Sequence, residues 1–356
     1  MPTPESRPSR FIAVSNAIRN LVARVSGKGK ATLYVHYPCF DGIASGVIAA
    51  DYLANVAPWK TWSVKPVDYT LAKTWLATKL DARSVVVDFL YHPEATFWAD
   101  HHATAFLNEE ARRSSEAPTA GRTILYDRHY PSCAKLLFDN LREHLSDEQR
   151  YRDLAFWANK IDSADYESAE EAMFSDEPAI EINLSLSDPS ASSLAYCNLL
   201  FRSLSSMTVR ETAALPSVRA LVRAVRERER RGLDEVRRSL VVESSNMAVF
   251  SAIETDTVTV NRYSPYAVLP DARYSVGLVQ RGGVWKITAM RNPWIDFDSV
   301  ELGHIFSAFG GGGHRRVASL LLSEDEDAAR AVLRDIVAEI RTRDAGIDHG
   351  PRRAYA

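Results

Sequence analysis

The sequence predicts an α/β protein. It has an N-terminal domain on a doubly wound, mainly parallel sheet, a long linker helix, and a smaller C-terminal α+β domain. Three observations support this prediction. Strand-like and helix-like runs alternate from residue 31 onward, a long charged helical pattern covers residues 217–240, and strand patterns dominate the chain beyond it. At 356 residues the chain is long enough for about two domains.

The first domain opens on a short β-rich run that ends at His36 and is followed by a helical stretch. Its clearest strand is the continuous apolar run Ser84–Phe89, which is typical of a strand covered on both faces. Residues 131–204 have a mostly helical pattern. Strands are predicted at residues 32–36, 62–69, 84–89 and 96–99, and helices at residues 42–53 and 71–80.

In the second domain, Gly282-Gly283 forms a predicted turn between two strands. A helix over residues 300–309 runs into four glycines. Strands are predicted at residues 247–253, 274–280 and 285–290, and a final helix at residues 324–343. The predicted organisation is a basic N-terminal extension, an α/β domain, a linker helix, an α+β domain and a disordered tail, at residues 1–30, 31–216, 217–240, 241–345 and 346–356.

The composition narrows the class of protein. Hydrophobic residues make up 46% of the chain, the net charge is −3, and no apolar run could span a bilayer, so we expect no membrane partner and no stable binding to duplex nucleic acid. The three cysteines are too few for a disulfide framework, which predicts a cytoplasmic protein. The basic extension is either a surface helix on the first domain, which we favour, or an organellar transit peptide.

Ligand-type side chains stand where predicted strands end. His36 ends the first strand, Asp88 lies near the end of the third, and the triplet Asp100-His101-His102 follows the fourth. Because ligands of doubly wound sheets gather beyond the carboxyl ends of strands, these residues can form one metal site. Cys39 and Asp41 follow His36 and could join it. Their alternative roles are a small buried residue and a helix N-cap.

Taken together, these motifs resemble the DHH phosphoesterase superfamily, with its RecJ-like and nanoRNase-like members. The ordered series in the first domain is His36…Asp41, Asp88, Asp100-His101-His102 and Asp162. In the second domain, residues 309–319 resemble the Gly-Gly-Gly-His loop of the DHH-associated domain. Residues 287–292 resemble that domain's strand with a substrate-binding Arg291. The resemblance covers about residues 31–320 in the right order.

The resemblance implies two divalent ions, most readily Mn²⁺. Asp88 would bridge them, His36 would bind the first ion, and the second ion would be bound by Asp41, His101 and Asp162. His102 would face the scissile phosphate, oriented by Asp100. A helix is expected to begin at the glycine loop and to help bind phosphate. The implied substrate-binding residues are Arg291, Gly311, Gly312, Gly313, His314 and Arg315.

Cys39 is the departure from this pattern, because it stands where the family has the first Asp of an Asp-x-Asp motif. A thiolate favours Zn²⁺, Fe²⁺ or Co²⁺, so the outcome is a mixed site that includes Cys39, a weakened first metal, or a one-metal enzyme; we favour retained catalysis.

Asp165 is the alternative to Asp162 as the last ligand. Three histidines without this context are expected to be structural or on the surface: His92, His129 and His304.

The predicted function is a phosphodiesterase that hydrolyses small phosphoester substrates by metal-activated hydroxide in a cleft between two domains. Its substrate would be a small nucleotide, a dinucleotide or a short single-stranded oligonucleotide, and the chain could act as a homodimer. Two alternatives stay open: a non-catalytic nucleotide-binding or sensory protein on a degenerate DHH scaffold, and a phosphomonoesterase or polyphosphatase.

Overall fold

The computed structural model describes residues 29–57, 59–117, 121–323 and 325–347. They form two compact units: the first holds the described residues up to Asp165 together with Asp176–Val222, and the second holds Tyr166–Ser175 together with the chain from Arg223. The sequence analysis placed Tyr166–Ser175 in the first domain, whereas it packs with the second unit. The predicted N-terminal extension and tail lie almost wholly outside the described residues.

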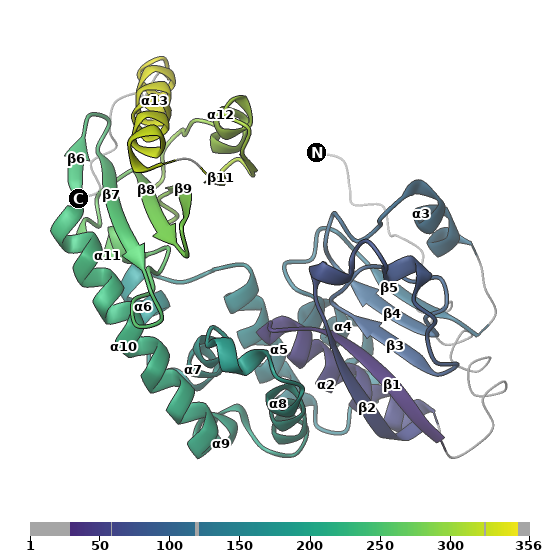
Figure 1. Cartoon of the computed structure of the whole chain (residues 1–356). Coiled ribbons are helices and arrows are strands. Elements are labelled where there is room, and N and C mark those ends of the chain that lie inside the picture. Colours follow the sequence, from purple (N-terminus) through teal and green to yellow (C-terminus); the bar gives the residue numbers. More distant parts are fainter. Residues whose placement is uncertain (1–28, 58, 118–120, 324, 348–356) are drawn as a thin grey trace, which may run out of the picture. The chain divides into compact units, whose positions relative to one another are not determined.

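The first unit contains a parallel sheet, as predicted (Figure 1). Its order is β2-β1-β3-β4-β5, and every neighbouring pair is parallel. The order reverses between β1 and β3, which makes the carboxyl ends of these strands the topological switch point. The short strand β5 was not predicted. The bounds are β1 (Gly29–His36), β2 (Trp59–Val67), β3 (Ser84–Val87), β4 (Phe97–Asp100) and β5 (Thr123–Tyr126).

Both faces of this sheet are covered, which explains the apolar character of its central strands. One face presents Tyr34, Val86 and Trp98 to a cluster that includes the buried Trp75. On the other face, Val35 packs against helix α2 (Phe40–Val56), and α4 (Cys133–Leu141) contacts β4. Strands buried on both sides read as continuous hydrophobic runs, as the pattern at residues 84–89 indicated.

The helix predicted over residues 71–80 is wrong. Two short 3₁₀ turns occupy this stretch, η1 (Tyr69–Leu71) and η2 (Trp75–Ala77). The Trp75 indole donates to the carbonyls of Leu90 and Tyr91 at 3.0 and 3.2 Å, which fixes the turn against the sheet. Threonine hydroxyls in the segment bond to main-chain carbonyls and compete with regular helix formation.

The helical pattern after residue 131 is confirmed. Helix α6 (Ala169–Phe174) buries Met173 in a cluster with Tyr266 and Met290 of the second unit. The long predicted linker helix is α10 (Pro216–Ser239), in which one unit ends and the other continues. The remaining helices of the first unit are α3 (Glu109–Glu116), η3 (Arg142–His144), α5 (Glu148–Asp162), α7 (Pro178–Ser185), η4 (Pro189–Ser192), α8 (Leu194–Ser206) and α9 (Val209–Ala213).

The second unit is α+β, as predicted. Its mixed sheet has the order β10-β11-β9-β8-β7-β6, with β7 and β8 parallel and the other pairs antiparallel. Side chains of α12 and α13 pack in one core with those of the sheet. The bounds are β6 (Val241–Glu243), β7 (Met247–Glu254), α11 (Ser264–Val268), β8 (Tyr274–Arg281), β9 (Val284–Arg291), α12 (Leu302–Ala308), β10 (Gly312–Gly313), β11 (Val317–Leu322) and α13 (Glu326–Ala345).

No helix in the described part of the chain has the length and apolar character that crossing a membrane requires. The cytoplasmic location stays a prediction.

Candidate metal centre

The turn from β1 into α2 brings three ligand-type side chains together. His36 is the last residue of β1, Cys39 immediately precedes α2, and Asp41 lies in the first turn of that helix. Gly42 makes the tight turn possible, because a Cβ atom there would lie 2.0 Å from the His36 carbonyl oxygen. The backbone approach that places His36 beside the start of α2 therefore requires glycine.

Helix α4 holds the Asp41 carboxylate. Its oxygens accept hydrogen bonds from the backbone N–H groups of Cys133 at 2.8 Å and Ala134 at 2.9 Å, at the start of that helix. Burial raises the pKa of Asp41, while nearby His101 and the two N–H donors favour the charged form. The helix start thus fixes the orientation of a carboxylate that is 1% exposed.

Asp88 lies at the middle of the group. It follows β3 with a φ of 56°, a left-handed conformation that Asp tolerates better than most residues. Its Oδ2 atom is 3.2 Å from His36 Nδ1, and its Oδ1 atom is 3.6 Å from His101 Nε2. Burial and the charges of Asp41 and Asp100 raise its pKa well above the ordinary range.

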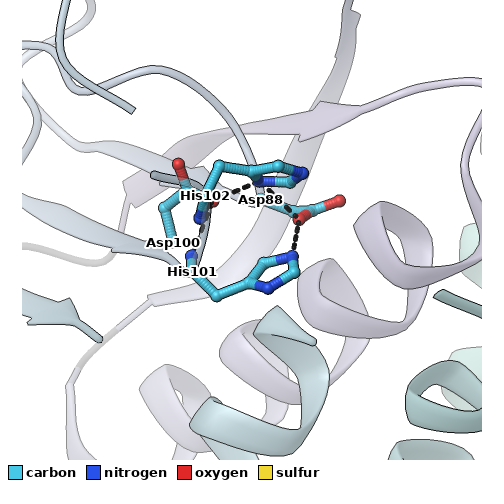
Figure 2. A group of neighbouring side chains, drawn as sticks. All are labelled: Asp88, Asp100, His101 and His102. Atoms are coloured by element: carbon cyan, nitrogen blue, oxygen red, sulfur yellow. Dashed lines mark hydrogen bonds and ion pairs between the residues drawn. The ribbon is translucent and has the colours of Figure 1, made fainter. Parts of the chain in front are cut away.

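The Asp100-His101-His102 triplet leaves β4 in a turn that Asp100 organises. Its Oδ1 atom accepts from the backbone N–H of His101 at 2.7 Å and lies 2.8 Å from His102 Nδ1. Burial favours neutral His102, but the hydrogen bond and charge of Asp100 outweigh it and raise its pKa. Figure 2 shows Asp88 between the two imidazoles.

His101 presents one ring nitrogen to three carboxylates. Its Nδ1 atom is 3.0 Å from the Tyr130 carbonyl oxygen, which can only accept, so Nδ1 carries the proton. The other ring nitrogen, Nε2, lies 3.8 Å from an Asp41 oxygen, 3.6 Å from an Asp88 oxygen and 3.4 Å from an Asp162 oxygen. This second hydrogen bond of a histidine is typical of metal ligands.

Asp162 is the last residue of α5 and completes this side of the centre. Burial and the charge of Asp41 raise its pKa to about 7. Asp165, its alternative, belongs to none of the ligand groups that the described residues form. The structure therefore places Asp162, and not Asp165, beside His101.

Ligand atoms within 4.8 Å of one another form three groups. One is His36, Cys39 and Asp88. Another is Asp41, His101 and Asp162. The third combines Asp88 with the triplet 100–102.

Several observations indicate that a cation fits these groups. Asp88 Oδ1, Asp100 Oδ2 and His101 Nε2 are buried without a hydrogen-bond partner, which is costly unless an ion satisfies them. Within the described residues, no lysine or arginine forms an ion pair with the carboxylates of these groups. Burial, with His102 nearby, lowers the pKa of His36 to about 4, which leaves a neutral imidazole available as a ligand.

The predicted substrate-binding residues lie in the second unit. Arg291 ends β9 and is 8% exposed, and its guanidinium donates to the carbonyls of Asn292 and Phe297 at 2.8 and 2.9 Å. It also stacks on the Phe297 ring, with its carbon 4.3 Å from the ring centroid. Contact between Arg291 and a substrate stays a prediction.

The helix expected after the glycine run is wrong. β10 and β11 form a hairpin there, whose exposed tip carries His314, Arg315 and Arg316. Buried residues alternate along β11, a period-two pattern that excludes a helix. Gly313 has a φ of 152°, and a Cβ atom there would lie 2.3 Å from the Val317 carbonyl oxygen.

Sequence reasoning missed Tyr69, in η1 just beyond β2. Its ring centroid lies 5.2 Å from that of His36 and 6.5 Å from that of His102, and the residue is 43% exposed. Burial of the hydroxyl and the charges of Asp100 and Asp88 raise its pKa. An aromatic residue after a strand at the edge that carries the ligands is the signal that could have found it.

The three histidines set aside lie in none of the ligand groups. His92 is buried against Trp75, with its Nδ1 atom 3.1 Å from the Glu94 N–H. His129 and His304 are exposed.

Comparisons with solved structures place this fold. No family model matches the chain, and no match is found among curated proteins. The pGpG-specific phosphodiesterase PggH from Vibrio cholerae superimposes with a TM-score of 0.66 at 17% identity, over 86% of this chain and 99% of that one. RecJ from Thermus thermophilus in complex with Mn²⁺ gives 0.55 at 17% identity, over 98% of this chain and 57% of RecJ. Its Mg²⁺ complex gives 0.51 at 18% identity, over 98% of this chain and 55% of RecJ.

These likenesses define the class of fold. The chain shares the fold of PggH and RecJ, in agreement with the fold that the resemblance predicted. It matches PggH over nearly that protein's whole length and spans little more than half of RecJ.

Proposed function

We propose that this chain is a metal-dependent phosphodiesterase that hydrolyses dinucleotides or short oligonucleotides. One observation carries the proposal: Asp88 contacts His36 on one side and lies 3.6 Å from His101, of the Asp41–His101–Asp162 group, on the other. A shared carboxylate between two ligand groups is what a pair of divalent ions needs. PggH is described as pGpG-specific, which favours a linear dinucleotide, and RecJ with Mn²⁺ or Mg²⁺ supports divalent ions, Mn²⁺ first.

The proposed chemistry divides between the ions and the side chains. When bound, two divalent ions lower the pKa of a water molecule and neutralise charge on the phosphoryl oxygens. His102 pairs with Asp100 through Nδ1, which leaves Nε2 to donate a hydrogen bond to a phosphoryl oxygen. The hydrogen bond and charge of Asp100 raise the pKa of His102, which favours the protonated ring that such a donor requires. Asp100 thus orients His102 and stabilises its charge.

In the second unit, the hairpin tip is the proposed phosphate-binding element. His314 and Arg315 are exposed there, beside backbone N–H groups of the glycine run. Exposed cations and glycine N–H groups suit phosphate, so the loop would select substrates with a terminal phosphate. Arg291 would support it, because its backbone N–H donates to the Arg316 carbonyl at 2.8 Å. Homodimer formation stays a prediction.

Cys39 supports the competing proposal, a non-catalytic nucleotide-binding protein. The deciding assay incubates the purified chain with Mn²⁺, Mg²⁺, Co²⁺ or Zn²⁺ and follows products by chromatography. The substrates are pGpG, other dinucleotides, cyclic dinucleotides, nucleoside 3′,5′-bisphosphate and polyphosphate. We expect the highest turnover on linear dinucleotides. Nucleotide binding without turnover under any ion would establish the non-catalytic protein instead, and turnover of polyphosphate alone would establish a polyphosphatase.

A matched pair of variants tests whether the proposed centre is responsible. Asp162→Asn removes a carboxylate 3.4 Å from His101 Nε2, whereas Asp165→Asn makes the same change on a residue outside the ligand groups. We expect Asp162→Asn to lower turnover by about 10²-fold or more, the scale of a misplaced catalytic group, and Asp165→Asn to leave it near the parent value. Equal effects of the two changes would contradict the assignment of the centre.

A further inference from the structure

The two halves of the centre offer chemically different ligands. On one side His36, Cys39 and Asp88 supply an imidazole nitrogen, a sulfur and a carboxylate oxygen. On the other side Asp41, His101 and Asp162 supply one nitrogen and two carboxylates. We propose that the Cys39 side binds a thiophilic ion of the Zn²⁺, Fe²⁺ or Co²⁺ kind, while the Asp41 side binds Mn²⁺ or Mg²⁺. This inference deepens the proposed function and rests on it for the pairing of two ions.

The position of Cys39 supports a ligand role. The residue precedes the first turn of α2, where Ser, Thr, Asp or Asn would be the favoured N-cap, so helix capping does not explain a cysteine. The residue is partly exposed, but burial of its sulfur and the charges of Asp88 and Asp41 raise the pKa of the thiol, so its neighbours and not its exposure mark it as a ligand. Its sulfur lies within 4.8 Å of ligand atoms of both His36 and Asp88.

The other cysteines provide the contrast. Cys133 and Cys197 are fully buried, and neither belongs to a ligand group among the described residues. The Cys133 thiol donates to the Ala99 carbonyl at 3.4 Å, so its sulfur has a structural partner. Cys39 therefore differs from both in its neighbours, which are the ligand-type side chains of His36 and Asp88.

Ligand chemistry then separates the two sides. Thiolate ligands select Zn²⁺, Fe²⁺ and similar ions over Mn²⁺ and Mg²⁺, whereas carboxylate-rich sites suit Mn²⁺ and Mg²⁺. Asp41 cannot easily adapt to a different ion, because two backbone N–H groups hold its oxygens at 2.8 and 2.9 Å. Asp88 touches both sides and would join two unlike ions.

The test uses the absorption of Co²⁺, which gains an intense near-ultraviolet band only when a thiolate binds it. We expect the full chain, stripped of metal and titrated with CoCl₂, to develop this band with the first equivalent. Cys39→Ser should abolish the band, and Cys197→Ala, which removes a thiol outside the ligand groups, should keep it. Co²⁺ binding by the parent without the band, or a band that survives in Cys39→Ser, overturns the inference.

A second variant covers the case in which Cys39→Ser does not fold, which circular dichroism and thermal unfolding would reveal. Cys39→Asp gives the first side an oxygen ligand. We expect the preference of this variant for Zn²⁺ over Mn²⁺ to fall by about tenfold or more, the scale on which substitutions around a metal site change its affinity. Competitive binding followed by elemental analysis measures this preference. An unchanged preference contradicts the inference.

The absorption readout needs no turnover, so the two proposals can fail separately. A cobalt band in a chain that hydrolyses nothing would overturn the proposed function alone. Turnover of dinucleotides by a chain without the band would overturn only the assignment of Cys39.

Discussion

Replacing Gly42 by alanine is expected to damage the metal centre although no ligand residue is replaced. In an ordinary helix this change stabilises by about 1 kcal/mol. Here the new Cβ atom would lie 2.0 Å from the His36 carbonyl oxygen, and such contacts essentially never fall below 3.0 Å, so the two backbones must separate by at least 1.0 Å. A misplacement of about 1 Å at a catalytic group can lower the rate by about 10²-fold, and overpacking costs about 1–3 kcal/mol.

The assay compares hydrolysis of pGpG at saturating Mn²⁺ and thermal unfolding for the parent and Gly42→Ala. Gly346→Ala is the matched control, because its Cβ atom would meet nothing closer than 3.4 Å, at the end of α13. We expect loss of activity and of stability for Gly42→Ala and neither for the control. A Gly42→Ala chain that is more stable than the parent and fully active would refute the argument from the close approach.

Three further predictions concern other parts of the chain. Tyr69→Ala should raise KM for dinucleotides by about tenfold, because an exposed ring beside the centre can stack a base. Tyr69→Phe should keep the parent KM. Steady-state kinetics that give the same KM for both variants would contradict a stacking role of the ring. The metal-free chain should lose stability as pH rises from about 4 to about 7. In the folded chain the pKa of Asp162 is raised to about 7, and the pKa values of Asp41 and Asp88 are raised as well. The folded chain therefore binds more protons than the unfolded chain in this range, so stability falls as these protons are lost. The lowered pKa values of His36 and His92 oppose this slope, because these histidines bind protons more readily in the unfolded chain. Mn²⁺ should flatten the slope in thermal melts across that range. Asp344→Ala should destabilise the second unit by about 3 kcal/mol, because it removes a buried carboxylate that lies 2.7 Å from the Arg273 guanidinium. Urea unfolding measures this change, and a loss below about 1 kcal/mol would contradict a structural role of the ion pair.

The sequence predicted the part of the site that depends on strand ends. His36, Asp88 and Asp100 come from β1, β3 and β4, which are neighbours in a parallel sheet. Their carboxyl ends therefore lie at one edge whatever the details of the helices. The resemblance to DHH proteins then added Asp162, which comes from a helix and has no strand to indicate its place.

The parts that the sequence did not predict depend on backbone groups and on tertiary packing. The N–H groups that hold Asp41 come from residues 133 and 134, and main-chain donors leave no mark in the sequence. The carbonyl of Tyr130 that sets the His101 tautomer is equally invisible. The hairpin after Gly313 and the turns around Trp75 were misassigned because short apolar runs fit a helix or a strand until their buried neighbours are known.

Helix α6 has a consequence for how the chain is made. It is synthesised within the sequence of the first unit, yet Met173 is buried with Tyr266 and Met290, which leave the ribosome much later. Until then its apolar face has no native partner, and a nascent chain is exposed to aggregation at that point. A truncation after α10 would leave the same face bare permanently. We therefore expect the first unit to require the rest of the chain, or deletion of residues 166–175, for soluble expression.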